Sequence, residues 1–243
     1  MKENKYDDEL FYEKYSHLPR SVDGLSAAGE WHELQKMLPD FSGKRVLDLG
    51  CGFGWHCIYA AEHGAESVIG VDISEKMLAV AREKTNLPNV SYVRAAIEEY
   101  GYPENSFDVV ISSLAFHYVE SFDDICSKVN HCLAKNGDFI FSVEHPIFTA
   151  QGSQEWVYSG ADNPLYWPVD NYFIEGRRDA RFLGEGITKY HRTLTAYIGC
   201  LLGNGFQITG FCEPTPPEEM LSLTDMKDEL RRPSMLIISA KRK

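Results

Sequence analysis

Short apolar runs alternate with segments of helical spacing through the first part of the chain. The runs are rich in β-branched residues and lie at 45–49, 67–72, 90–95, 107–113 and 137–143. The segments between them carry apolar residues at helical spacing and lie at 55–64, 74–84 and 122–137. Because polar residues do not alternate with apolar ones in the runs, they predict strands buried on both faces of a parallel sheet. This order predicts right-handed βαβ units in a doubly wound α/β fold.

Two residues mark helix ends in this pattern. Ser74 precedes the second helical segment and is predicted to be its N-cap, because a serine hydroxyl accepts a backbone N–H there. Gly137 follows the third segment and is predicted to end that helix.

The alternation stops after Pro146. Residues 147–190 are rich in aromatic side chains and glycine, and they are too long for a simple connection and too aromatic for disorder. We expect an inserted lid with some β structure. A helix at 192–203 and strands at 206–212 and 234–240 then resume the alternation, while residues 6–38 predict helices over one end of the sheet. The chain is interpreted as a single domain with a helical cover at 1–40, a core at 41–146, the lid at 147–190 and the rest of the sheet at 191–243.

The composition is that of an acidic globular protein. The chain has 243 residues, with 24 Lys and Arg against 36 Asp and Glu, and a net charge of −12. This balance argues against nucleic acid and anionic membrane surfaces as partners of the whole chain. No apolar run is long enough to cross a membrane, and the first residues lack the apolar core of a signal peptide. Six cysteines form no C-x-x-C pair, which predicts reduced thiols, no structural zinc site and a cytoplasmic protein.

The most specific motif is a glycine loop between the first strand and the first helix after it. Its glycines are Gly50, Gly52 and Gly54, and glycine lets a backbone approach a ligand closely. Such a turn lies at the carboxyl end of a strand, where open α/β sheets bind ligands. Asp72 ends the second strand about twenty residues later, where a carboxylate accepts hydrogen bonds from ribose hydroxyls. Together they predict a nucleoside-containing cofactor rather than only a tight turn.

The spacing of the loop distinguishes between two cofactors. A dinucleotide loop reads G-x-G-x-x-G, but Trp55 occupies the third glycine position and would crowd a diphosphate at the helix N-terminus. Asp48, two residues before the first glycine, suits a cationic amino or sulfonium group. The loop therefore favours S-adenosylmethionine over NAD. A nicotinamide-dependent oxidoreductase and a non-catalytic module that binds a nucleoside cofactor are the alternatives.

Four segments carry a resemblance to a known family. They are VLDLGCGFG at 46–54, VIGVDIS at 68–74, FDVVISSLAFHYV at 107–119 and GDFIFSVEHP at 137–146. Over residues 44–145 their order and spacing resemble those of class I S-adenosylmethionine-dependent methyltransferases, in the small-molecule type-eleven group. The resemblance implies methyl transfer to a small molecule. It also implies a mostly parallel, seven-stranded Rossmann-like sheet in which the strand at 234–240 runs antiparallel beside that at 206–212.

The resemblance further implies which residues bind the cofactor. The methionine portion is assigned to Asp48, Gly50, Cys51 and Gly52, the ribose to Asp72, the adenine to Ile73, Met77, Ala96 and Ile97, and the sulfonium to Leu114. In similar enzymes the N-terminal segment folds over the cofactor, which adds Tyr15 and Arg20. Ala96 is a departure, because the family often has an acid there that binds the adenine amino group. That contact is left to the backbone or to Glu98, whose other interpretation is a solvated acid at a helix start.

Methyl transfer needs an in-line approach of the acceptor, and a base only where the acceptor arrives protonated. Histidine titrates near neutrality, so His117, His145 and His191 are candidate bases, each with a structural role as the alternative. With no metal-ligand cluster in the sequence, we expect metal-independent transfer.

The sequence predicts chemical features of the acceptor but not its identity. Arg192, with Arg177, Arg178 or Arg181, is predicted to clamp a carboxylate or phosphate on the acceptor, unless these arginines form a solvated face. Trp156 and Tyr172 are predicted to line an apolar pocket over the acceptor, unless they pack the lid. The identity of the acceptor and of its methylated atom stays open.

Overall fold

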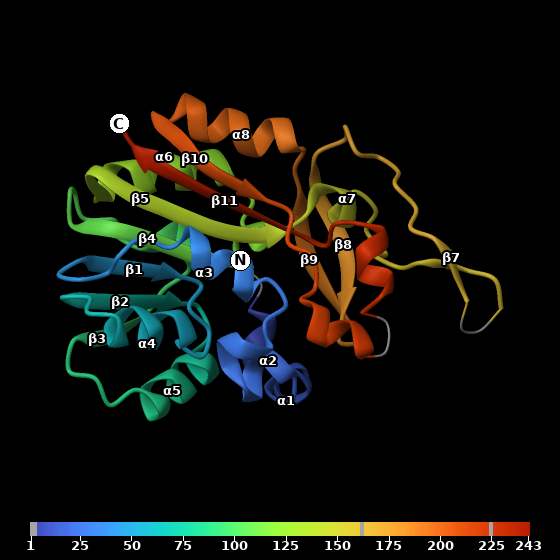
Figure 1. Ribbon diagram of the computed structural model, residues 1–243, viewed down its shortest axis with the longest axis horizontal. Helices are drawn as coiled ribbons and strands as arrows, with labels where there is room; N and C mark the ends of the chain where they lie inside the picture. The colour runs from blue at the N-terminus through green and yellow to red at the C-terminus, as the bar shows by residue number, and fades with distance from the viewer. Residues whose placement is uncertain (1–3, 161–162, 224–225) are drawn as a thin grey trace.

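A central sheet with the strand order β10-β11-β5-β4-β1-β2-β3 organises the computed structural model (Figure 1), which describes residues 4–160, 163–223 and 226–243. The strands are β1 (Arg45–Leu49), β2 (Ser67–Asp72), β3 (Val90–Arg94), β4 (Phe107–Ser113), β5 (Leu133–Glu144), β10 (Phe206–Cys212) and β11 (Met235–Arg242). β11 is antiparallel to both β5 and β10, and the other neighbouring pairs are parallel. The predicted seven-stranded, mostly parallel sheet is confirmed.

Helices cover both faces of the sheet. One face is covered by α3 (Trp31–Met37), α4 (Trp55–Glu62) and α5 (Glu75–Lys84), and the other by α6 (Phe122–Cys132) and α8 (Leu194–Gly203). In β1, Val46 packs toward α3 and α4, whereas Leu47 and Leu49 pack toward α6 and α8. Burial on both faces explains why the strand sequences are continuously apolar.

Of the two predicted helix ends, the one at Ser74 is confirmed and the one at Gly137 is not. Ser74 is the N-cap of α5, since its hydroxyl accepts the Met77 N–H at 3.2 Å. The prediction for Gly137 is wrong, because α6 ends at Cys132 and Gly137 lies inside β5. A Cβ at Gly137 would stand 3.0 Å from the Asp108 carbonyl oxygen, so the glycine permits close approach to β4.

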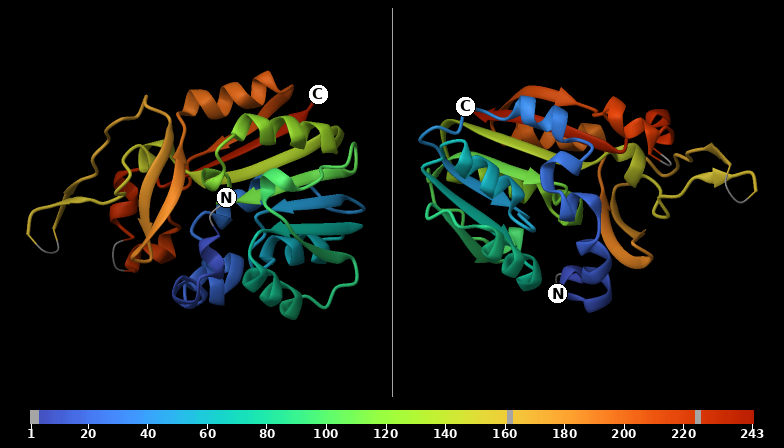
Figure 2. Two further views of the ribbon diagram at one scale, coloured as in Figure 1. Left: turned by 180° about the vertical axis from the view of Figure 1, so that it is seen from behind. Right: turned by 60° about the horizontal axis from the view of Figure 1, so that its bottom comes forward.

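The N-terminal cover (residues 4–30) lies at the carboxyl ends of the parallel strands, between the sheet and the lid (Figure 2). Its elements are η1 (Lys5–Asp7), α1 (Glu9–Ser16), α2 (Pro19–Val22) and η2 (Gly24–Ala27), where η denotes a 3₁₀ helix. Asp8 caps α1 by accepting the Phe11 N–H at 3.0 Å, and Pro19 opens α2.

The inserted segment has the expected β structure. It contains α7 (Pro146–Thr149), β6 (Val157–Tyr158), β7 (Pro164–Tyr166), β8 (Gly176–Phe182) and β9 (Glu185–His191). β8 and β9 form an antiparallel hairpin, which we call the lid hairpin, and β6 and β7 form an arm that extends away from the sheet (Figure 1).

The C-terminal part completes the sheet. Two short 3₁₀ helices, η5 (Glu218–Ser222) and η6 (Asp228–Arg231), lie between β10 and β11. The pairing of these strands shifts register between Ile208 and Gly210 of β10. Among the described helices, none is long and apolar enough to cross a membrane.

Candidate functional site

The glycine loop makes a sharp turn between β1 and α4. The Gly50 N–H donates to the Val71 carbonyl at 2.8 Å. Gly50 and Gly54 have φ values of +75° and +77°, in the left-handed region that glycine tolerates. A Cβ at Gly50 would stand 2.5 Å from the Ala115 Cβ, and one at Gly54 would stand 2.3 Å from the Tyr92 hydroxyl. Both glycines are therefore required by the turn itself.

Gly52 faces open space instead of protein. No atom lies within 4 Å of the position that a Gly52 Cβ would take. Its N–H donates to Asp72 Oδ2 at 2.9 Å, and Asp72 Oδ1 accepts the Ser74 N–H at 2.9 Å. Burial raises the pKa of Asp72, and the two N–H groups oppose this rise only in part. The backbone bonds orient the carboxylate and leave lone pairs for hydroxyl donors.

Asp48 is a buried carboxylate with one oxygen left unpartnered. Its Oδ2 accepts the Cys57 thiol at 3.3 Å, while Oδ1 has no hydrogen-bond partner in the described part of the chain. Burial raises the pKa of Asp48 to about 7, the thiol lowers it and the charge of Asp72 raises it further. Such a carboxylate is suited to a cationic ligand group that donates a hydrogen bond.

Replacing Asp48 with asparagine is expected to remove a pH dependence of stability. The folded-state pKa of about 7 exceeds the ordinary 3.8, so between these values the folded protein holds a proton that the unfolded chain releases. Wild-type stability should therefore fall as pH rises through this window, by on the order of 4 kcal/mol in total, and the variant should lack this fall. Urea denaturation without cofactor, at about pH 5 and about pH 8, covers the upper part of this window and should show roughly 3 kcal/mol of the fall. Parallel pH profiles for the two proteins would contradict the assignment.

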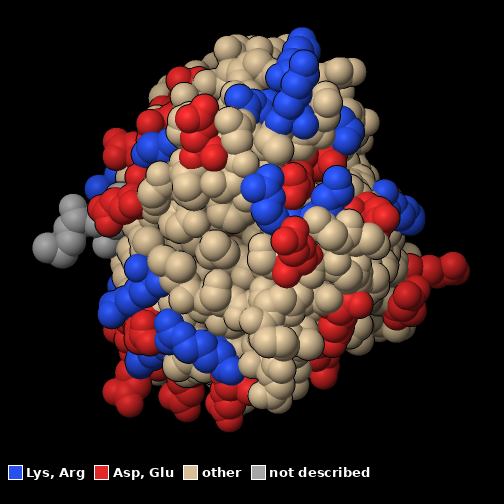
Figure 3. Space-filling view, turned by 90° about the vertical axis from the view of Figure 1, so that its left-hand side faces the viewer, with Lys and Arg blue, Asp and Glu red and all other residues tan. Residues whose placement is uncertain are grey.

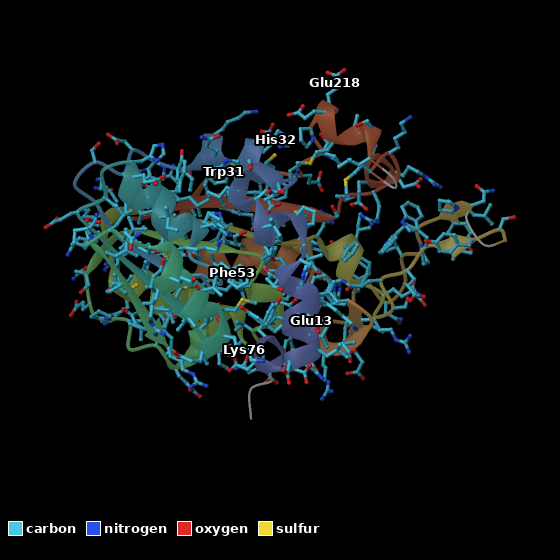
Figure 4. All side chains as sticks on the ribbon, turned by 90° about the horizontal axis from the view of Figure 1, so that it is seen from below. Glu13, Trp31, His32, Phe53, Lys76 and Glu218 are labelled. Carbon is cyan, nitrogen blue, oxygen red and sulfur yellow. The ribbon has the colours of Figure 1, made fainter. Side chains whose placement is uncertain are left out.

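A pocket lies between the glycine loop and the N-terminal cover. The cover supplies Tyr15, Arg20, Ser21, Gly24, Leu25 and Ala28, and the sheet end supplies Gly50, Cys51, Gly52, Phe53, Trp55, His56 and Ser113. Tyr15 and Arg20 are thus brought together with three of the loop residues assigned to the methionine portion. Phe53 lies beside α1 (Figure 4), with its ring centroid 6.3 Å from that of Tyr12 and 6.0 Å from that of Tyr15.

Arg20 supplies a buried positive charge to this pocket. Its Nη2 lies 2.9 Å from Oε1 of Glu30, and the other oxygen of Glu30 has no partner among the described residues. Burial lowers the pKa of Arg20, but the Glu30 carboxylate outweighs this effect and the pKa is raised. A guanidinium that faces the glycine loop suits a carboxylate on the ligand.

The residues assigned to the adenine lie around the start of α5 and the end of β3. Met77 and Ala96 are buried, and the Ile97 Cδ1 lies 3.5 Å from the Cβ position at Gly50. Ile73 directly follows Asp72. Glu98 lies in η3 (Ile97–Glu99), where its carbonyl accepts the Lys128 ammonium at 2.8 Å.

Leu114 directly follows β4 and has a left-handed conformation. Its φ is +52°, and its N–H donates to the Ser142 carbonyl at 2.9 Å. For a residue with a Cβ this conformation costs roughly 1 kcal/mol, which the surrounding hydrogen bonds offset. Strained backbone at the carboxyl end of a strand is typical of a ligand site in an α/β sheet.

His117 is buried, and its ring accepts a backbone hydrogen bond through one nitrogen. Its Nδ1 accepts the Glu144 N–H at 3.3 Å, which assigns the ring proton to Nε2. Burial lowers the pKa of His117 to about 4, against the opposing charge of Glu144. At neutral pH the ring therefore offers an N–H donor at Nε2, and a role for His117 as general base stays a prediction.

His191 uses both ring nitrogens within the protein, whereas His145 uses Nδ1 and places Nε2 at ion-pair distance from a glutamate. His145 caps α7 through the Ile147 N–H at 3.0 Å, and its Nε2 lies 2.8 Å from Oε1 of Glu213. His191 lies between the Thr149 hydroxyl and the Tyr172 carbonyl, each at 2.8 Å. The contact of His145 with the Ile147 N–H fits the alternative of a turn-fixing role, and His191 is held by contacts within the insert. In the ranges that the structure describes, no three His, Cys, Asp or Glu side chains are grouped to hold a metal ion.

The predicted arginine clamp is not assembled. Arg192 is buried and donates to the backbone carbonyls of Phe116, Val119 and Glu120. Arg177 is exposed and pairs with Asp179 at 3.0 Å. Of the two further candidates, Arg178 donates to backbone carbonyls of the insert and Arg181 is exposed on β8. Arg192 is therefore a structural residue.

Trp156 and Tyr172 pack within the insert. Trp156 lies edge-on against Trp167, and the Arg231 guanidinium lies 4.6 Å from the Trp156 ring centroid. The Tyr172 hydroxyl accepts the Leu194 N–H at 3.2 Å, at the start of α8. These contacts agree with the alternative in which Trp156 and Tyr172 pack the lid.

Sequence reasoning misses a buried ion pair at the carboxyl end of β5. The Lys189 ammonium lies 2.5 Å from Oε1 of Glu144, and Gln154 donates to Oε2 at 2.9 Å. Burial alone would raise the pKa of Glu144, but His117 and Lys189 outweigh it and the pKa is lowered. The position of Glu144 after a predicted strand is a usable signal. No sequence signal marks Lys189, because its partner Glu144 lies far away in the sequence.

Comparisons with known proteins identify the family. A family model described as a methyltransferase domain, Methyltransf_11, matches residues 47–141. A proposed S-adenosylmethionine-dependent methyltransferase from Listeria monocytogenes is 59% identical, with a TM-score of 0.87 over 90% of this chain and 99% of that chain. An S-adenosylmethionine-dependent methyltransferase from Mesorhizobium loti is 41% identical, with a TM-score of 0.83 over 90% of this chain and 100% of that one.

A further relative matches the chain over nearly its whole length. It is an uncharacterised protein from Haemophilus influenzae, 35% identical over 98% of this chain and 96% of its own length. These matches confirm S-adenosylmethionine as the cofactor and remove the nicotinamide alternative. The chain belongs to the class I S-adenosylmethionine-dependent methyltransferases.

Proposed function

We propose that this methyltransferase acts on a small-molecule acceptor bound between the N-terminal cover and the lid hairpin. The observation that carries the proposal is the packing of the cover on the hairpin. Phe11 of α1 is fully buried against Ala180 and Ile187 of the hairpin, and Lys14 donates to the Leu183 carbonyl at 3.1 Å. Tyr118, which follows β4, packs against the same cluster, so the cover and the hairpin meet near the carboxyl end of β4. A site covered in this way favours a small molecule over a protein or nucleic-acid chain.

The chain's own residues fit the cofactor. The open space at Gly52 admits a ligand against the backbone, and the unpartnered oxygen of Asp48 suits a cationic amino group. Asp72 would accept the ribose hydroxyls, and Arg20 would hold the carboxylate of the methionine portion. When bound, S-adenosylmethionine supplies an electrophilic methyl group.

Polar groups on the acceptor side would orient the acceptor. They are the Nε2–H of His117, the Glu144–Lys189 pair, and the hydroxyls of Tyr6 and Tyr118, which lie 3.3 Å apart. Holding an acceptor in line with the methyl group supplies much of the rate of such a transfer. His117 would contribute a hydrogen bond from its Nε2–H.

The charge of the protein also argues against a polyanionic acceptor. Figure 3 shows Lys and Arg interspersed with Asp and Glu on the face at the amino ends of the parallel strands, without a continuous basic surface. The net charge of −12 opposes a polyanion.

Transfer of a labelled methyl group tests the acceptor class. The protein is incubated with S-adenosylmethionine labelled in the methyl group and with cell extract separated into small-molecule, protein and RNA fractions. We expect label in products of the small-molecule fraction and none with an Asp72→Ala control. Label confined to protein or RNA would overturn the proposal.

A further inference from the structure

Asp7 reaches from the N-terminal cover to the start of α5. Its Oδ1 accepts the Ser74 hydroxyl at 2.5 Å and the Lys76 N–H at 3.1 Å, and its Oδ2 accepts the Glu75 N–H at 3.4 Å. Burial would raise the pKa of Asp7, but the Ser74 hydroxyl and the two N–H groups outweigh it and the pKa is lowered. A distant carboxylate thus caps a helix that already has Ser74 as its local cap.

The same helix start holds the ribose-binding carboxylate. The Ser74 N–H donates to Asp72 Oδ1, while the Ser74 side chain donates to Asp7. Asn4, three residues before Asp7, donates to the Ile73 carbonyl at 3.4 Å. The loop at 72–74 is therefore fixed from outside by the cover and not only by its own strand and helix.

The cover is joined to the core beside the pocket. Asp7 binds the start of α5, while Arg20 lines the pocket and is held by Glu30 within the cover itself. Between them Tyr15 lines the pocket, and η1 and α1 lie close to α5 (Figure 2). A ligand bound against the glycine loop would therefore lie next to a cover whose position depends on Asp7.

We propose that Asp7 is a positioning residue for cofactor binding, which closes the cover over the cofactor and holds the 72–74 loop in its binding conformation. The proposal rests on the cofactor site at Gly52 and Asp72 and not on the class of acceptor. Its test therefore uses the demethylated cofactor, S-adenosylhomocysteine, and needs no acceptor.

The first variant is Asp7→Ala. We expect S-adenosylhomocysteine to bind about tenfold more weakly, mainly through faster dissociation, because charge-assisted hydrogen bonds are lost from the closed state. Titration calorimetry gives the affinity. Stopped-flow fluorescence gives the dissociation rate, with Trp55 in the pocket as the reporter. In the cofactor-free protein, amide hydrogen exchange in residues 4–22 should become faster.

Two further variants separate this role from a general effect on the helix. Glu75→Ala removes an acidic side chain from the same turn of α5, where it pairs with Arg82 at 2.6 Å, and should leave affinity within about twofold. Asp7→Asn keeps an acceptor oxygen and should fall between wild type and Asp7→Ala.

The possible results are distinct. Wild-type affinity and dissociation rate in Asp7→Ala would overturn the proposal, even if the melting temperature fell, since Asp7 would then be a helix cap only. An equal loss in Glu75→Ala would also overturn it. Failure of the wild-type protein to bind S-adenosylhomocysteine would remove the cofactor site and the proposal with it, whereas a change in acceptor class would leave both intact.

Discussion

Asp72→Ala is expected to weaken binding of S-adenosylmethionine by at least about a hundredfold. A hydrogen bond to a charged group contributes roughly 1.5–3 kcal/mol, and the variant would lose those to the ribose. It would also free the N–H groups of Gly52 and Ser74, which Asp72 orients at 2.9 Å. Titration calorimetry with the cofactor measures the loss.

An exposed aspartate provides the control for this variant. Asp40 accepts the N–H and the hydroxyl of Ser42, at 3.0 and 2.8 Å, so Asp40→Ala also removes local hydrogen bonds. Its cofactor affinity should equal that of the wild type. Unchanged affinity in Asp72→Ala would show that the cofactor binds elsewhere.

Arg192→Met is expected to lower the free energy of unfolding by about 3–4 kcal/mol. The variant keeps the aliphatic bulk but removes the guanidinium donor of the Val119 and Glu120 carbonyls, and it leaves the Phe116 carbonyl with only the Val119 N–H. These carbonyls belong to the segment that follows β4, so its position depends on the guanidinium. Urea denaturation of the cofactor-free protein measures the effect.

Arg177→Met is the matched control for Arg192. The Arg177–Asp179 pair is exposed, with 67% and 82% of the two side chains accessible, so its loss should cost less than about 0.5 kcal/mol. If Arg192→Met were as stable as Arg177→Met, Arg192 would be free for the acceptor after all.

The strands could be predicted because each one has its own local run of apolar residues. β1 and β2 are continuous apolar runs, and the glycine loop follows β1 directly. The requirement for glycine at Gly50 is also local, since its left-handed φ arises within the turn. Residues 44–145 therefore held most of the information about the fold and the predicted cofactor residues.

The acceptor side could not be predicted because its contacts join distant segments. Lys189 meets Glu144 only when the lid hairpin packs on β5, and His117 acquires its tautomer from a backbone N–H on the neighbouring strand. The sequence does not show whether the N–H groups of a histidine or an arginine are hydrogen-bonded within the folded protein. Gly137 is a second example. A glycine after a helical pattern can end the helix, but it can also allow two strands to approach closely, as Gly137 does.

The register shift in β10 has a consequence for how this protein avoids joining other copies through its sheet. β10 is an edge strand, and such a strand presents unpaired N–H and C=O groups that another chain can extend. Between Ile208 and Gly210 the pairing is interrupted, and a Cβ at Gly210 would stand 2.5 Å from the Ser239 hydroxyl oxygen. The irregularity breaks the straight row of free backbone groups, so an incoming strand could match it over only a few residues before losing alignment. The glycine that permits this irregularity thereby helps to protect the sheet edge from aggregation.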